Sequence, residues 1–287
     1  MCKRNRSEGW KHAKLTGHSN EESIAKKINN DIQFKENFEK KLNLNIKIES
    51  VNVGGLNEKS VDDVFGGKTK SKTDLTILFH NKKTKNISIK KSLGGQVYLI
   101  GVERFLDGFE KQFNKKISNE VKRSIRLFFG NAVDVEKIID DIKLDDLKND
   151  NQIKIKNYEK RKRRITWNTL EKYDQNLSNS LINWFKENID NLFLFCFQRG
   201  LSNNSSDWAD FVWYKNELNE NKVDELFDLA ELSKKLNSSN CKKDIFPGKT
   251  GGGTTIQLPF GFVQWHQSQI QFHHKFNKIQ KLKSEMR

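Results

Sequence analysis

The first third of the chain switches between helical and strand spacing of its hydrophobic residues. Ile24, Ala25 and Ile28 recur at helical spacing after the polar segment Gly17–Asn20, which is able to cap a helix. Residues 44–51 instead alternate strictly between apolar and polar side chains, as expected for a half-buried strand. The elements predicted in this region are helices over about 20–31 and 34–42, strands over 44–51, 73–79 and 86–90, and a hairpin turn over 80–85.

Beyond residue 100 the pattern is first helical and then mixed. Phe105, Phe109 and Phe113 fall on one helical face, within a region that keeps helical spacing from 102 to about 142. The very apolar run 192–197 is compatible with either a buried strand or the end of a helix. The further predicted elements are a helix from 177 into that run, a strand over 210–214, a helix over 223–236 and a pair of strands within 254–276, separated by residues 259–261.

This succession of strands and helices predicts an α/β fold with a central mixed β-sheet flanked by helices. A chain of 287 residues is long enough to bury a substantial core. We expect one domain over residues 1–287, with a core at about 15–130 and a mixed α/β extension at about 145–287.

The charge balance suggests a polyanionic partner. The 52 Lys and Arg residues outnumber 37 Asp and Glu, which leaves a net charge of +15 and favours nucleic acid through long-range attraction and counterion release. An AT-rich genome, which enriches Lys, Asn and Ile in every protein, is the alternative explanation. Cys2, Cys196 and Cys241 are too few and too scattered for a disulfide framework or a zinc cluster. With no apolar targeting or membrane-spanning stretch, these features predict a cytoplasmic protein.

The candidate chemistry lies on the predicted hairpin. Ser88 and Lys90 alternate along one strand, so that their side chains share a face, and residues near the open end of the hairpin can bring Asp74 opposite them. Cleavage of a phosphodiester needs a hard cation and a positioned water. Asp74, the main-chain carbonyl of Ile89 and Lys90 could supply these functions, with Glu21 of the preceding helix as a further carboxylate near the metal. The alternative is a solvated Asp–Lys pair.

These segments resemble the PD-(D/E)xK nucleases and, within them, MspI-like type II restriction endonucleases. By this resemblance Asp74 and Glu21 bind Mg²⁺, Lys90 acts on the attacking water, and the fold has a restriction-endonuclease-like core. One departure is Ser88, because the superfamily usually has Asp or Glu there and MspI-like members have Asn or Gln. The resembling residues are 17–25, 72–77 and 87–92, with a weaker similarity over 160–164, 183–188 and 199–200.

The resemblance also implies partners: double-stranded DNA cut at a short specific sequence, a cognate DNA methyltransferase, and a monomer or homodimer. The alternatives are a structure-specific repair or recombination nuclease and a non-catalytic nucleic-acid-binding protein.

Several polar residues outside the catalytic group are expected to contact DNA. Ser92 and Gln96 flank a Gly-Gly pair that would let the main chain approach the duplex, although an ordinary strand-to-strand turn explains this segment equally well. A Gln- and His-rich stretch over 264–274 is either an interaction surface or a set of core-edge histidines. The predicted DNA contacts are Lys91, Ser92, Gln96, Lys160, Arg161, Lys162, Arg163, Arg164 and Arg199.

Overall fold

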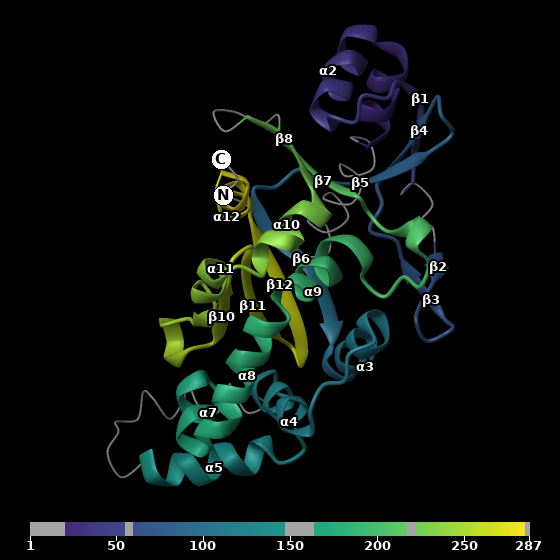
Figure 1. The fold of residues 1–287 in the computed structure, drawn as a ribbon. Helices are drawn as coiled ribbons and strands as arrows, with labels where there is room; N and C mark the ends of the chain where they lie inside the picture. The colour runs from purple at the N-terminus through teal and green to yellow at the C-terminus, as the bar shows by residue number, and fades with distance from the viewer. Residues whose placement is uncertain (1–20, 55–59, 147–163, 217–221, 285–287) are drawn as a thin grey trace, which may run out of the picture. The chain divides into compact units, whose positions relative to one another are not determined.

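A computed structural model describes residues 21–54, 60–146, 164–216 and 222–284 (Figure 1). The chain forms two units, one made of Met1–Ser92 with Phe197–Glu231 and the other of Leu93–Cys196 with Leu232–Arg287. Each unit combines a five-stranded sheet with helices. Within the described residues no helix is long and apolar enough to cross a lipid bilayer.

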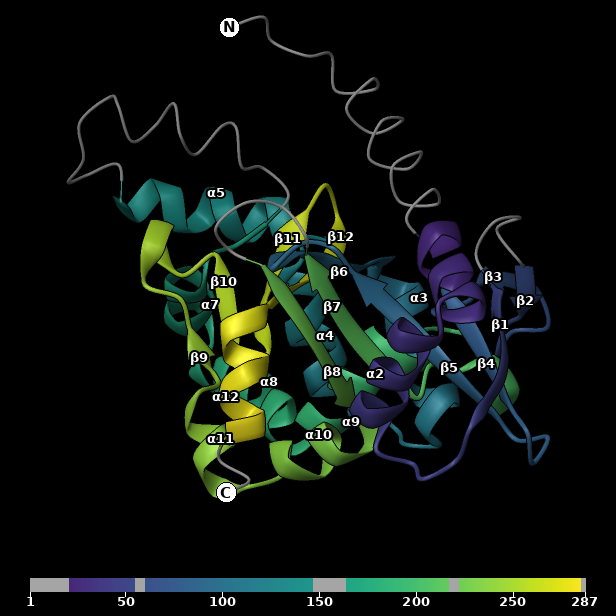
Figure 2. The same cartoon turned by 90° about the horizontal axis from the view of Figure 1, so that it is seen from above.

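The sheet of the first unit is mixed, as the sequence predicts. Its strands lie in the order β1-β4-β5-β7-β8 (Figure 2), and every neighbouring pair is antiparallel except β5 and β7, which are parallel. The α/β fold with a central mixed sheet and flanking helices is therefore confirmed. The strands are β1 (Ile48–Val53), β4 (Leu75–Phe79), β5 (Thr84–Lys90), β7 (Phe211–Asn216) and β8 (Val223–Asp228), and a separate hairpin pairs β2 (Ser60–Asp62) with β3 (Lys68–Lys70).

One face of this sheet is apolar and packs against two helices near the N-terminus. The helix over residues 21–30 and α2 (Ile32–Leu42) contribute side chains to the same buried cluster as the sheet. Phe38 of α2 stacks on Trp213 of β7, with 4.7 Å between ring centroids. Because Ile87 and Ile89 of β5 point into this core, the alternating residues Ser88 and Lys90 lie on the opposite face.

The second unit has an antiparallel sheet in the order β6-β12-β11-β10-β9. On one of its faces, the ring centroid of Phe272 lies 5.8 Å from that of Phe105, a helical residue that also contacts Trp184 and Phe195. This face therefore packs against helices. The strands are β6 (Gly94–Gly101), β9 (Phe246–Pro247), β10 (Thr255–Leu258), β11 (Gly261–His266) and β12 (Gln269–Lys275). The α-helices are α3 (Val102–Phe113), α4 (Asn119–Phe128), α5 (Val135–Asp146), α7 (Trp167–Tyr173), α8 (Gln175–Glu187), α9 (Ile189–Leu194), α11 (Ser239–Lys243) and α12 (Phe276–Ser284), while α10 (Leu229–Leu236) spans the boundary between the units.

Most predicted elements are confirmed, and two expectations are wrong. The region 223–236 is not one helix, because its first half is β8 and only its second half is helical. The stretch 254–276 holds three strands rather than two. The strand β6 was not predicted, and it begins at Gly94 within the segment 91–96, for which a turn was one of two interpretations. The apolar run 192–197 is helical, ending α9 and beginning a short π-helix over Phe195–Arg199.

Candidate active site

Hydrogen bonds to β5, the strand that pairs with β4, fix the position of Asp74 and its carboxylate. Asp74 precedes β4 by one residue instead of lying within the strand, but its backbone N–H donates to the carbonyl oxygen of Ile87 at 2.8 Å. Its Oδ2 accepts hydrogen bonds from the backbone N–H of Ile89 at 2.6 Å and from the Ser88 hydroxyl at 3.3 Å. Thr73 anchors the preceding residue through a 3.0 Å bond from its hydroxyl to the carbonyl oxygen of Asp207. The hairpin therefore brings Asp74 beside Ser88.

Ser88 connects Asp74 to Lys90. The Lys90 Nζ donates to the Ser88 Oγ at 2.8 Å, and the same hydroxyl donates to Asp74. Ser88 is 1% exposed, so little water competes for its hydroxyl. A serine can accept from an ammonium group and donate to a carboxylate at the same time, which a second carboxylate could not do. Ser88 thus connects Asp74 and Lys90 through a single hydroxyl group.

The parallel neighbour of β5 adds a residue that sequence reasoning missed. Tyr214 of β7 is the ladder partner of Lys90, so the two side chains share one face of the sheet. Tyr214 is fully buried, and this burial raises the pKa of its phenol. The buried phenol adds no charge on the face that carries Lys90. The pairing of β5 with a strand more than a hundred residues away gave no local signal in the sequence.

Glu21 is electrostatically coupled to this group. The pKa of Glu21 is raised to about 7, first by burial and second by the negative charge of Asp74, whereas Lys91 and Lys90 act in the opposite direction. Burial also raises the pKa of Asp74, against the opposing effects of Lys90, the Ile89 N–H and the Ser88 hydroxyl. Lys91 follows Lys90 and has its pKa lowered by burial, while Glu21 opposes that shift. The two carboxyl groups are therefore desolvated, and both lie within electrostatic reach of the neighbouring lysines.

The donor atoms of this region suit a hard divalent cation. Within a strand, the N–H and C=O of one residue point to the same edge, so the Ile89 carbonyl faces the β4 side where its N–H meets Asp74. Asp74, Glu21 and this carbonyl are oxygen donors of the kind that Mg²⁺ prefers. No group of three or more His, Cys, Asp or Glu side chains suited to a metal occurs in the part of the chain that the structure describes. This donor set fits a cation that keeps several waters and shares a substrate phosphate, which is usual for Mg²⁺.

The residues expected to contact DNA are distributed over both units. In the first unit, Lys91 is half-buried and Ser92 exposed at the end of β5, and the guanidinium of Arg199 lies 4.2 Å from the centroid of the Trp208 ring. In the second unit, Gln96 is an exposed residue of β6, and the Arg164 guanidinium lies 5.1 Å from the centroid of the Trp265 ring. The basic residues Lys160, Arg161, Lys162 and Arg163 lie outside the described residues.

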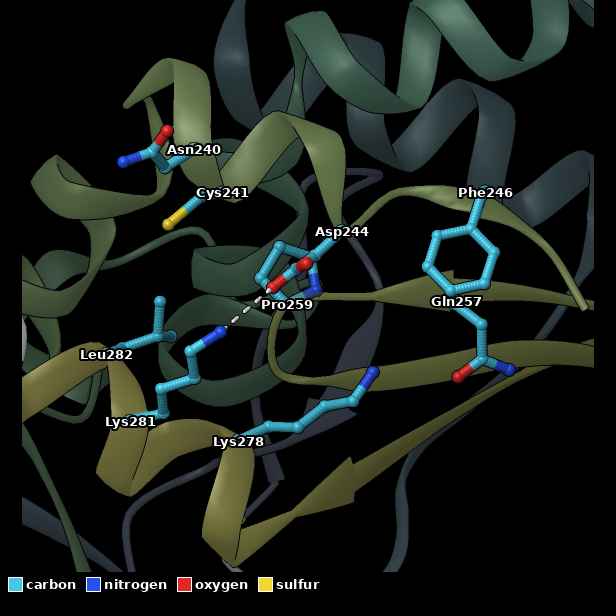
Figure 3. A pocket seen from close by; sticks show the side chains of 9 residues that line it. All are labelled: Asn240, Cys241, Asp244, Phe246, Gln257, Pro259, Lys278, Lys281 and Leu282. Atoms are coloured by element: carbon cyan, nitrogen blue, oxygen red, sulfur yellow. Dashed lines mark ion pairs between the residues drawn. The ribbon is translucent and has the colours of Figure 1, made fainter.

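A pocket of about 410 Å³ in the second unit is lined by Lys278, whose ammonium group is used in hydrogen bonds to the main chain (Figure 3). The Nζ of Lys278 donates to the carbonyl oxygens of Leu258 and Gly261 at 2.7 and 3.0 Å, which ties α12 to the β10–β11 turn. Lys281 lies 3.9 Å from Asp244 across the pocket. The Lys278 ammonium group is thus engaged in holding α12 against this turn, whereas the Lys281–Asp244 pair is exposed.

Comparisons with solved structures show a distant likeness in fold. The chain is similar to the crystal structure of the restriction endonuclease MspI in complex with its cognate DNA, with a TM-score of 0.45, 15% sequence identity, and coverage of 86% of this chain and 81% of that chain. No protein-family model and no curated protein sequence matches the chain.

Proposed function

We propose that the protein is a Mg²⁺-dependent endonuclease that hydrolyses double-stranded DNA at a short specific sequence, as type II restriction endonucleases do. The observation that carries this proposal is the linked group of Asp74, Ser88 and Lys90 on one sheet face, with Glu21 coupled to it. A solvated surface pair would show neither a buried bridging hydroxyl nor carboxyl pKa values raised by burial.

The proposed roles follow from what each group can do to a phosphodiester. When bound, Mg²⁺ would neutralise charge on the scissile phosphate and lower the pKa of a water molecule. Asp74, Glu21 and the Ile89 carbonyl would hold the cation. Lys90, oriented by Ser88, would donate to the attacking water or to the phosphate oxygens and stabilise the negative charge that develops there.

The sequence-specific part of the proposal draws on the expected DNA contacts. Lys91 and Ser92 follow the catalytic lysine directly, so a backbone contact there would fix the scissile phosphate relative to Lys90. The net charge of +15 would support association with any duplex. A restriction role also implies a methyltransferase that protects the same sequence in the host.

Digestion of a plasmid of known sequence, with and without Mg²⁺, tests the proposal directly. Fragments with unique ends that appear only with the metal are the expected result. Ends scattered over many sequences, or confined to branched and mismatched substrates, would favour a repair or recombination nuclease. Duplex binding without cleavage under any divalent metal would leave only a non-catalytic nucleic-acid-binding protein.

A further inference from the structure

The second unit carries a sheet face whose polar residues are almost all uncharged. Its strands β6, β10, β11 and β12 contain no Asp or Glu, and their one Lys or Arg is Lys275, although the chain has 37 acidic residues. Residues paired between neighbouring strands share a face of the sheet. Gln264 of β11 is paired with Gln271 of β12, and His273 of β12 lies between its partners Phe262 of β11 and Gln96 of β6. The opposite face, with Phe272, packs against helices.

The glutamines on this face form a chain of hydrogen bonds across three strands. The Gln264 Nε2 donates to the Gln271 Oε1 at 2.8 Å, and the Gln271 Nε2 donates to the Gln96 Oε1 at 2.6 Å. The Gln264 Nε2 also lies 3.3 Å from the Nε2 of His273. Gln271, in the centre, is 8% exposed, whereas Gln96 is exposed and Gln264 is half-buried. The buried central amide therefore fixes the orientation of the two outer ones.

The fixed orientation of Gln96 leaves hydrogen-bond donors and an acceptor of its amide group at the exposed end of this chain of hydrogen bonds. The Gln96 Oε1 retains a second lone pair, and its Nε2 carries two donor hydrogens. An amide that presents an acceptor and a donor side by side pairs bidentately with the N6 and N7 of adenine in the major groove. A glutamine with a free side chain would lose rotamer entropy on binding, whereas Gln96 is already held by Gln271.

The charge distribution along the face suits a DNA duplex. Phe262 and His273 stack with 4.4 Å between centroids and an angle of 6°, which makes a flat uncharged platform next to the amides. Lys275 is exposed at the end of β12, with its Nζ 5.7 Å from the Phe262 ring. Uncharged donors and acceptors beside a cation complement a groove, in which uncharged base edges lie between charged phosphates.

We infer that this amide row reads base edges of the duplex, with Gln96 and Gln264 as contacting residues and Gln271 as the residue that positions them. This inference rests on the proposed nuclease function and deepens it, because it assigns sequence preference to a surface of the second unit. An amide row that only stabilises the sheet would not change which sequence is bound.

The test separates binding from cleavage by using the full chain with the Asp74→Ala change throughout. Each protein selects ligands from a pool of randomised duplexes in the presence of Mg²⁺, and the bound fraction is sequenced. In this background, Gln96→Ala should lower discrimination at one base pair by about 5- to 150-fold, the range for one bidentate contact. Gln271→Leu should weaken discrimination at the same base pair without touching DNA. Gln175→Ala, at an exposed glutamine that begins α8, is the matched control and should leave the preference unchanged.

The outcomes distinguish the inference from the function on which it rests. The parent here is the chain with Asp74→Ala alone. If it selects a sequence and the Gln96→Ala and Gln271→Leu variants select that sequence equally well, the inference is overturned and the nuclease proposal is left intact. A parent that binds all duplexes alike would overturn it too. A parent that binds no duplex, when the chain without Asp74→Ala also cuts none, would refute the proposed function itself. Because Gln96 is exposed, its replacement should not affect folding, which a thermal melt can verify.

Discussion

Replacing Glu21 by Gln tests the electrostatics of the candidate site without any DNA. The pKa of this carboxyl rises from an ordinary 4.5 to about 7, mainly because it is buried. A carboxyl with a higher pKa in the folded chain keeps its proton longer there than in the unfolded chain. Glu21 therefore makes the free energy of unfolding fall as the pH rises from about 4.5 to about 7, and this loss is complete above pH 7.

The magnitude follows from the same pKa. Each unit of difference between the pKa values of the folded and unfolded chains corresponds to about 1.36 kcal/mol. Above pH 7, ionised Glu21 therefore lowers the free energy of unfolding by at most about 3.4 kcal/mol. Solvent screening at a half-buried group reduces this to roughly 1–3 kcal/mol. The Glu21→Gln protein lacks the titrating group and should be more stable than the parent by this amount at pH 8, with little difference at pH 4.

Urea unfolding of both proteins between pH 4 and pH 8 in EDTA measures this difference. Part of the pH dependence should survive in Glu21→Gln, because burial also raises the pKa of Asp74. Added Mg²⁺ should stabilise the parent at pH 8 more than the variant, since the proposed cation would bind only the folded site and would lose one ligand in the variant. Superimposable pH profiles for the two proteins would refute the assignment of Glu21 to this buried group.

The remaining predictions concern the reaction. Asp74→Ala should abolish cleavage, by about a thousandfold or more in rate, while duplex binding in a gel-shift assay persists, because it removes a ligand and not a phosphate contact. Lys90→Ala should be similarly inactive and Lys91→Ala should retain cleavage in single-turnover assays; the reverse result would shift the catalytic lysine by one residue. Ser88→Ala should slow cleavage by about 10- to 100-fold, the value of one hydrogen bond to a charged group, and a rate equal to that of Asp74→Ala at saturating Mg²⁺ would contradict this role.

The sequence was informative where the decisive interactions are local. The β4–β5 hairpin joins segments that are adjacent in the chain, so alternation alone predicted which side chains would share a face with Asp74. β6 was missed because Gly94 and Gly95 favour a turn, and its partner β12 lies about 175 residues further on. β8 was taken for part of a helix because the apolar spacing of 223–236 is continuous through both elements. There, pairing with β7 overrides local preference.

The use of serine at position 88 has a physical consequence for the whole site. A carboxylate at this position would stand against Asp74 at close range, and two like charges in a buried region cannot both ionise without a cation between them. The Ser88 hydroxyl avoids this repulsion and links Asp74 to Lys90 instead. The folded chain therefore holds Lys90 in place without a cation, and the proposed metal site has one fewer charged ligand than a carboxylate at this position would give. We expect the proposed site to gain much of its affinity for Mg²⁺ only when a DNA phosphate supplies further oxygen atoms, which would couple metal binding to substrate binding.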